Sequence, residues 1–107
     1  MKEISALDLK NTVATAVLPL VVDIYSPQCV PCRSLLPVLN DLETEFAGKI
    51  DFVKINAMAD EESTKTCGEL GVRNVPALII FKGGTEVARR VGSASKTELQ
   101  SWITSTL

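Results

Sequence analysis

The 107-residue chain contains no histidine, and only 5% of its residues are aromatic, among them one tryptophan, Trp102, and one tyrosine, Tyr25. Histidine is the commonest metal ligand and the side chain best suited to act as a general base near neutral pH. Its absence leaves cysteine thiols, carboxylates, lysines, the tyrosine and backbone groups to carry any chemistry.

Cysteine is scarce as well, since the chain has three. An odd number of cysteines argues against a structural framework of disulfides. The N-terminal residues Met1 to Ile4 lack the apolar stretch and the small-residue cleavage site of a signal peptide. We therefore expect a cytoplasmic protein.

Long apolar runs and a strong excess of one charge are also missing. The longest apolar run extends from Ala16 to Val22, contains Pro19 and ends at Asp23, so it is too short to cross a bilayer. The formal net charge is -2, and charges of both signs are mixed along the chain, unlike the basic footprint of a nucleic-acid-binding protein. We expect neither a membrane nor a nucleic acid as a partner.

The composition is that of an ordinary globular domain. Apolar residues make up 46% of the chain and charged residues 22%. A chain of this length can bury a core without help from a metal or from disulfides, and it has room for one domain. We expect a single domain over residues 1–107 and, because no feature indicates self-association, a monomer.

Strand and helix signals alternate along the chain. Apolar segments predict strands over residues 20–25, 50–56 and 77–82, with a short first strand over residues 2–4 and a last strand over residues 85–91. Periodic apolar positions predict helices over residues 6–15, with Val17 counted among the apolar positions of this first helix, and over residues 30–46, 60–70 and 96–106. Strands joined by helices should pair in parallel, whereas Gly83-Gly84 predicts a hairpin between the last two. The order predicts an α/β fold: a three-layer α/β/α sandwich with a central mixed sheet of about five strands and about four helices.

The segment Cys29-Val30-Pro31-Cys32 lies between a predicted buried strand and the start of the longest predicted helix. The N-terminus of a helix carries a partial positive charge and free N–H groups, which stabilise a thiolate and lower the pKa of a thiol. Cys29 is placed to attack a target disulfide, and Cys32, one turn later, is placed to displace the target thiol from the mixed disulfide. This arrangement predicts a thiol–disulfide oxidoreductase with Cys29 as nucleophile and Cys32 as resolving thiol.

Two other interpretations of these cysteines are weaker. A Cys-x-x-Cys pair forms half of many zinc sites, but there is no second pair and no histidine, so we expect no metal. Inert structural cysteines are disfavoured by the placement between a strand and a helix. Cys67, in the predicted third helix, is either a small buried hydrophobic residue or a regulatory thiol open to glutathionylation or dimer formation.

Several separated segments resemble the thioredoxin family, in the family's order and over nearly the full length of the chain. They are Val22–Cys32, Val53–Asn56, Gly71–Ala77, Phe81–Gly84 and Val91-Gly92, together with Pro37 where the family has a helix-kinking proline. The resemblance implies the thioredoxin fold and a protein disulfide reductase, an electron carrier with no bound cofactor beyond its reversible Cys29–Cys32 disulfide. It also implies two kinds of partner, which are disulfide-containing target proteins and a flavin-dependent thioredoxin reductase.

The resemblance gives roles to further residues. It makes Asp23 a buried proton acceptor for Cys32, with Lys54 as the partner of that acid. It makes Val75-Pro76 a cis peptide that faces the cysteines, and it adds these two residues to Val30, Pro31 and Gly92 as the surface that binds a target chain. From the residues alone, a solvated carboxylate at a strand edge, an outward lysine and an ordinary trans turn proline remain open.

The chain departs from the family pattern beside the first cysteine. Gln28 and Tyr25 stand where the family usually has tryptophan, and Val30 stands where it usually has glycine. The lost aromatic surface should change the choice of partner more than the reaction, and the retained Pro31 favours a reductant. Trp102, in the last predicted helix, should belong to the core.

Two other functions compete with a reductase. A disulfide oxidase or isomerase is disfavoured by the missing signal peptide and by Pro31. A thioredoxin-fold binding module without turnover is disfavoured by the presence of both cysteines and of Asp23.

Overall fold

The computed structural model describes residues 1–107 and follows the predicted order of elements. Its strands are β1 (Lys2–Glu3), β2 (Leu20–Tyr25), β3 (Asp51–Asn56), β4 (Ala77–Lys82) and β5 (Thr85–Val91), and its helices are α1 (Leu9–Thr15), α2 (Val30–Glu45), α3 (Glu61–Glu69) and α4 (Lys96–Thr106), with a 3-10 helix η1 (Ala6–Asp8) before α1. None of the helices combines the length and the apolar character that crossing a bilayer requires.

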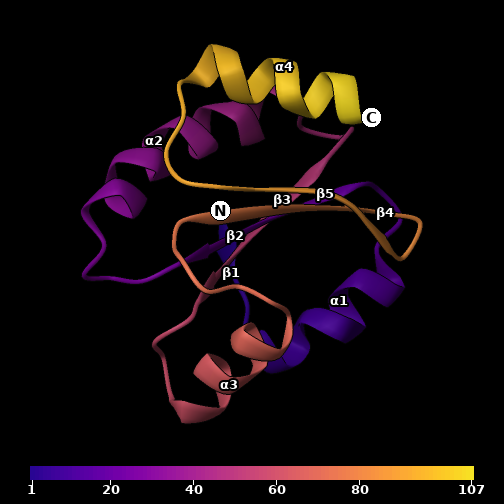
Figure 1. The fold of residues 1–107 in the computed structure, drawn as a ribbon. Helices are drawn as coiled ribbons and strands as arrows, with labels where there is room; N and C mark the ends of the chain where they lie inside the picture. Colours follow the sequence, from indigo (N-terminus) through magenta and orange to yellow (C-terminus); the bar gives the residue numbers. More distant parts are fainter.

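The five strands form one mixed sheet in the order β1-β3-β2-β4-β5 (Figure 1). β1 and β2 both pair with β3 in parallel, because helices connect them, while β2–β4 and β4–β5 are antiparallel. The predicted hairpin of β4 and β5 turns at Gly83 and Gly84, whose φ angles of 61° and 82° suit glycine. The predicted α/β fold, with a mixed five-stranded sheet and four helices, is confirmed.

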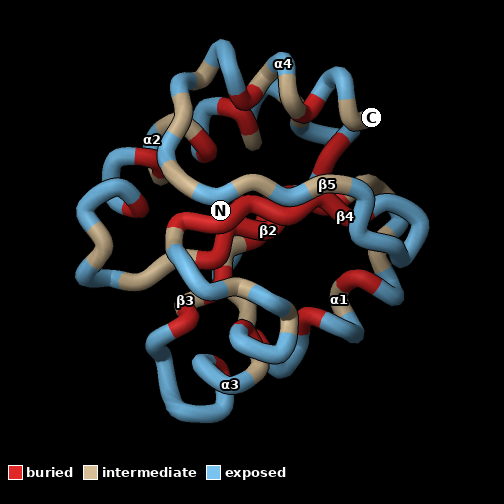
Figure 2. Tube along the Cα trace, in the orientation of Figure 1, coloured by how far each residue is buried: buried red, intermediate tan, exposed pale blue.

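Helices cover the sheet on both faces, α1 and α3 on one and α2 and α4 on the other (Figure 1). β2 and β4 therefore bury side chains in both directions, and Figure 2 shows them as a buried band through the middle of the molecule. Along β2, Val22 and Ile24 belong to the core on the α1/α3 face, whereas Val21 packs with Leu35 and Leu39 on the α2/α4 face. Because side chains alternate along a strand, the residue after Val22 points toward α2.

The predicted helix over residues 6–15 is a 3-10 turn followed by a short α-helix. Ser5 caps the 3-10 turn, since its hydroxyl oxygen accepts a hydrogen bond from the N–H of Leu7. Val17, which the sequence pattern counts among the apolar positions of this helix, lies beyond the end of α1 and is 96% exposed. The prediction that Val17 contributes to the apolar face of this helix is therefore wrong.

Trp102 corrects the expectation of a core tryptophan. The side chain is only half-buried, at the edge of the α2/α4 core. The guanidinium of Arg90 lies 5.4 Å from its ring centroid, a cation–π distance. Trp102 thus covers the edge of the core and contacts the guanidinium of Arg90 with its ring.

Candidate functional site

The redox cysteines begin helix α2, as the sequence predicts. Cys29 is the N-cap, and its Sγ accepts a hydrogen bond of 3.2 Å from the N–H of Cys32. Pro31 lies in the first turn, where its missing N–H has no helical partner to lose. The free N–H groups of this turn and the helix dipole favour negative charge on the Cys29 sulfur.

Cys29 and Cys32 form a disulfide, with their Cα atoms 5.2 Å apart. Cys29 is half-buried, whereas Cys32 is 4% exposed. Cys29 is therefore the more accessible of the two cysteines to a partner, whereas Cys32 is shielded behind it.

The predicted cis peptide between Val75 and Pro76 is present, just before β4. The carbonyl oxygen of Val75 lies 3.7 Å from the Sγ of Cys29, so the structure brings this segment to the cysteines as expected. The carbonyl of Pro76 accepts a hydrogen bond of 2.8 Å from Gly92, which ties in the end of β5. Val75 itself has no backbone hydrogen bond through its N–H or its C=O. Val30, the residue after Cys29, is exposed.

Asp23 is the one carboxylate buried in the sheet, 2% exposed and pointing toward α2. Its Oδ1 has no hydrogen-bond partner. Burial raises the pKa of this carboxyl to about 7, against a smaller opposing effect of the positive charge on Lys54. The alternative of a solvated carboxylate at a strand edge is therefore wrong.

A small hollow joins Asp23 to Cys32. It measures about 60 Å³, and its lining also includes Lys54 and Arg33. The exposed surface of the hollow is largely apolar, but its volume can hold a water molecule and the Asp23 carboxylate in its lining offers that water a hydrogen-bond partner. The resolving cysteine and the buried acid thus share a route along which a proton can move.

Lys54 lies opposite Asp23 in the register of β2 and β3. Its Nζ is 5.7 Å from the centroid of the Tyr25 ring, and the Tyr25 hydroxyl donates a hydrogen bond to Glu3 in β1. Sequence reasoning named Lys54 but missed Glu3, because a two-residue strand offers no periodic signal from which its register could be found.

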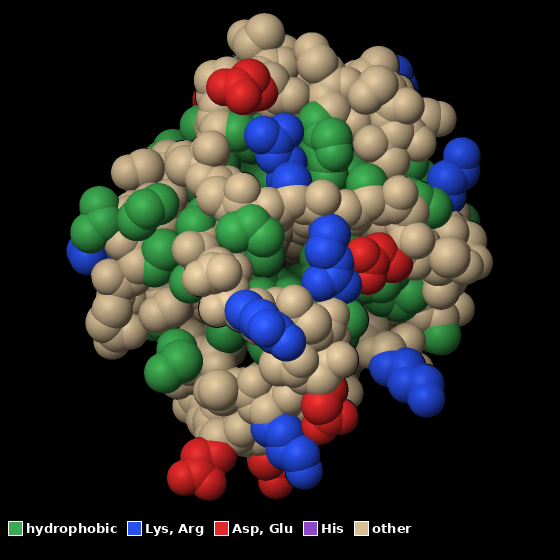
Figure 3. Space-filling model, viewed as in Figure 1, with side chains coloured by type: hydrophobic (Ala, Val, Ile, Leu, Met, Phe, Trp, Pro, Cys, Tyr) green, Lys and Arg blue, Asp and Glu red, His purple; other side chains and the backbone are tan.

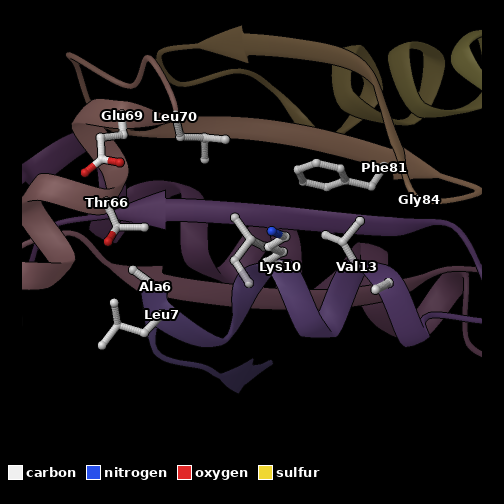
Figure 4. Close-up of a pocket in the computed structure, with 11 residues that line it drawn as sticks. Ala6, Leu7, Lys10, Val13, Thr66, Glu69, Leu70, Phe81 and Gly84 are labelled. Carbon is white, nitrogen blue, oxygen red and sulfur yellow. The ribbon is translucent and has the colours of Figure 1, made fainter.

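The largest hollow lies elsewhere, between α1, α3 and β4 on the other face of the sheet (Figure 4). It measures about 590 Å³, and its lining is mostly apolar, with Phe81, Leu70 and Val13, but also includes Lys10 and Glu69. None of the redox residues lines it. The face seen in Figure 3 carries positive and negative side chains scattered among apolar ones.

Known proteins are similar in sequence to this chain over almost all of its length. The family model described as Thioredoxin matches residues 1–105. A thioredoxin of Haemophilus influenzae is 37% identical over 94% of this chain and 91% of its own length, and one of Synechocystis is 37% identical over 94% and 92%. A thioredoxin of Rhodospirillum rubrum is 36% identical over 96% of both chains.

The chain belongs to the thioredoxin family. With the Cys29–Cys32 disulfide in place, membership makes the protein a thiol–disulfide oxidoreductase, an enzyme whose redox centre is this cysteine pair. Thioredoxins use no cofactor apart from that disulfide, and the structure has no group of three or more His, Cys, Asp or Glu side chains that could hold a metal ion. Family membership also implies a thioredoxin reductase and disulfide-bearing targets as partners.

Proposed function

We propose that this member of the thioredoxin family is a protein disulfide reductase of the cytoplasm, a monomer of one domain that carries electrons from a flavin-dependent thioredoxin reductase to disulfide-bearing target proteins. The observation that supports this best is the asymmetry of the cysteine pair. Cys29 is accessible at a helix N-terminus, and Cys32 is buried behind it beside an acid. An electron carrier needs one thiol that meets the target and a second that releases it.

In the proposed reaction the thiolate of Cys29 attacks one sulfur of the target disulfide. The target's other sulfur leaves as a thiol, and a mixed disulfide to Cys29 remains. The thiolate of Cys32 then attacks the Sγ of Cys29, which releases the second target thiol and closes the Cys29–Cys32 disulfide. The target gains two electrons and two protons, and the reductase returns them to the protein.

We assign the proton of Cys32 to Asp23. A buried thiol is a poor nucleophile until it loses its proton, and a carboxylate with a pKa near 7 can take that proton at neutral pH. The hollow of about 60 Å³ gives the transfer a path through water. The positive charge of Lys54 keeps part of the Asp23 population ionised.

We place the target chain along Val75 and Pro76, with Val30, Pro31 and Gly92 around it. Val75 has an unpaired N–H and C=O beside Cys29, so an extended target segment can form backbone hydrogen bonds there, as in β-strand addition. The exposed apolar side chain of Val30, next to Cys29 in the chain, adds contact area for the target.

Two measurements test the proposal. Equilibration of the protein with a dithiol buffer of known potential should give a Cys29–Cys32 couple more reducing than the glutathione pool. A potential at the oxidising end of the range for such proteins would contradict the reductase and favour an oxidase or isomerase. If the cysteine pair forms no reversible disulfide, a binding module without turnover would be favoured.

The second measurement addresses the order of the thiols. A Cys32→Ser variant should accumulate a mixed disulfide between Cys29 and the target, because the resolving step is lost. An Asp23→Asn variant should resolve the same intermediate roughly 10- to 100-fold more slowly than the wild type near pH 7. Unchanged resolution in Asp23→Asn would contradict the role of the acid while leaving the cysteine roles intact.

A further inference from the structure

Three charged side chains form a row across the strands β1, β3 and β2. Glu3 is paired in register with Lys54, and Lys54 is paired with Asp23. Paired residues of parallel strands point to the same face, and neighbouring strands lie about 4.8 Å apart. One cation therefore lies between two carboxylates, Glu3 at the edge of the sheet and Asp23 in its centre.

Lys54 makes a salt bridge with neither carboxylate, since none of the four ion pairs of the molecule includes it. Its ammonium lies instead over the ring of Tyr25, at 5.7 Å from the centroid. Tyr25 comes two residues after Asp23, so its side chain leaves β2 on the same face.

Glu3 holds the far end of that ring. The Tyr25 hydroxyl donates a hydrogen bond to a carboxylate oxygen of Glu3, which joins the edge strand to the centre of the sheet. This hydrogen bond orients the ring, and the ammonium of Lys54 lies over it.

The charges that face Asp23 come from three strands and one helix. Lys54 in β3 is the cation that favours its ionised form, Glu3 lies beyond Lys54 in β1, and Tyr25 follows in β2. From α2, Cys32 and Arg33 line the shared hollow. Glu3 and Asp23 carry like charges on either side of the same ammonium in the register, so an ammonium nearer to one carboxylate acts less on the other.

We propose that Glu3 is a positioning residue for the resolving step, which through Tyr25 keeps the ammonium of Lys54 away from Asp23 so that Asp23 can accept the proton of Cys32 at neutral pH. This role rests on the proposed function of Asp23. The tryptophan that the family usually has at position 25 lacks the hydroxyl that donates this hydrogen bond.

The test is a Glu3→Gln variant, which keeps an oxygen to accept from Tyr25 and removes the charge. The carboxyl carbon of Asp23 is titrated by NMR in the oxidised protein at low salt. Its midpoint should fall by about 0.5 pH unit or more, because Lys54 is then attracted to Asp23 alone. The pH profile of mixed-disulfide resolution should move to lower pH by the same amount.

Asp51→Asn is the matched control. It also removes one negative charge from the sheet, but three residues from Lys54 along β3 and therefore on the opposite face. It should leave the Asp23 midpoint in place. A midpoint that stays fixed in Glu3→Gln, in a variant with wild-type melting temperature, overturns the proposal.

Two further variants separate positioning from a simple charge effect. Tyr25→Phe keeps the ring and the charge of Glu3 but removes the hydrogen bond, so the Asp23 midpoint should also fall, by less than in Glu3→Gln. In a Lys54→Gln background the effect of Glu3→Gln should shrink, and an undiminished shift there would overturn the positioning role.

The inference and the proposed function fail in different experiments. If Glu3→Gln moves the midpoint but Asp23→Asn resolves the mixed disulfide at the wild-type rate, Glu3 still tunes Asp23 and the catalytic role of the acid is wrong. If the mixed disulfide resolves more slowly in Asp23→Asn but the titration midpoint of Asp23 is unchanged in Glu3→Gln, Asp23 acts as the acid without any influence of Glu3.

Discussion

Cys32 and Cys67 are equally buried, each 4% exposed, and each lies in a helix, yet their surroundings give them different chemistry. Cys32 lies in the first turn of α2, bonded to Cys29 and beside the hollow that holds Asp23. Cys67 lies near the C-terminal end of α3 and packs into the apolar core on the α1/α3 face.

Position along the helix and polar neighbours distinguish the two thiols, since burial is the same. The start of a helix favours a thiolate, and its end disfavours one. Burial raises the pKa of the Cys67 thiol, and no acid lies buried beside it to take a proton. The structure therefore favours Cys67 as a small buried hydrophobic residue over Cys67 as a regulatory thiol.

Replacing one cysteine in each region should give the largest difference in activity. Cys29→Ser should lower the rate of disulfide reduction by roughly 1000-fold or more, because the nucleophile is lost. Cys67→Ser should keep the wild-type rate. Steady-state reduction of a protein disulfide measures both, and a comparable loss in Cys67→Ser would place Cys67 in the reaction.

The buried acid beside Cys32 should have the next largest effect, on stability. The pKa of Asp23 is about 7 in the folded protein and near 3.8 when exposed, so the folded state binds its proton more tightly. Stability from this group is complete below pH 4 and is lost as the pH rises to 7. Asp23→Asn should therefore be more stable than the wild type by on the order of 2–4 kcal/mol at pH 8, with little difference at pH 4.

Urea unfolding of both proteins at the two pH values measures this difference. Asp51→Asn, an exposed carboxylate on the same sheet, is the control and should change stability by less than about 0.5 kcal/mol. An Asp23→Asn gain that is equal at pH 4 and pH 8 would mean that packing, and not ionisation, causes it.

The contrast between the two regions was only partly predictable from the sequence. The placement of Cys29 and Cys32 between a strand and a helix follows from local patterns, since an apolar run ends at Tyr25 and a helix-compatible pattern starts at Val30. The neighbours of Cys67 along the chain, Thr66 and Gly68, carry no comparable signal, and its burial depends on how α3 packs against the sheet.

Register across strands is the part that local patterns cannot supply. Asp23 and Lys54 are 31 positions apart, and their pairing depends on parallel alignment of β2 and β3 over their whole length. Resemblance to the family named these two residues in advance, but it assigned no role to Glu3, which enters the row through the pairing of β1 with β3. The half-exposed Trp102 was missed for a similar reason, because Arg90 reaches it from a neighbouring strand.

A smaller effect is expected where Cys67 lies in the apolar core. Cys67→Ser should destabilise the protein by about 1–2 kcal/mol, because a hydroxyl loses water without gaining a partner. Cys67→Ala, which leaves only a small void, should cost less. Chemical denaturation gives both values, and alkylation of the reduced native protein should modify Cys29 and spare Cys67. Fast alkylation of Cys67 would restore the regulatory interpretation.

The smallest effect on activity is expected from a residue that borders the accessible Cys29. Cys67 is buried and has no such accessible surroundings. Gln28 precedes Cys29, is exposed, and accepts a hydrogen bond of 3.2 Å from the hydroxyl of Ser26. Gln28→Trp should change kcat/KM by a few-fold, in directions that differ between partners, because a large aromatic surface contributes to docking. The reduction potential should stay the same, since the Cys29–Cys32 pair and Asp23 are untouched. Kinetics with a thioredoxin reductase and with two unrelated disulfide targets measure the effect, and identical kinetics with all three would show that Gln28 does not select partners.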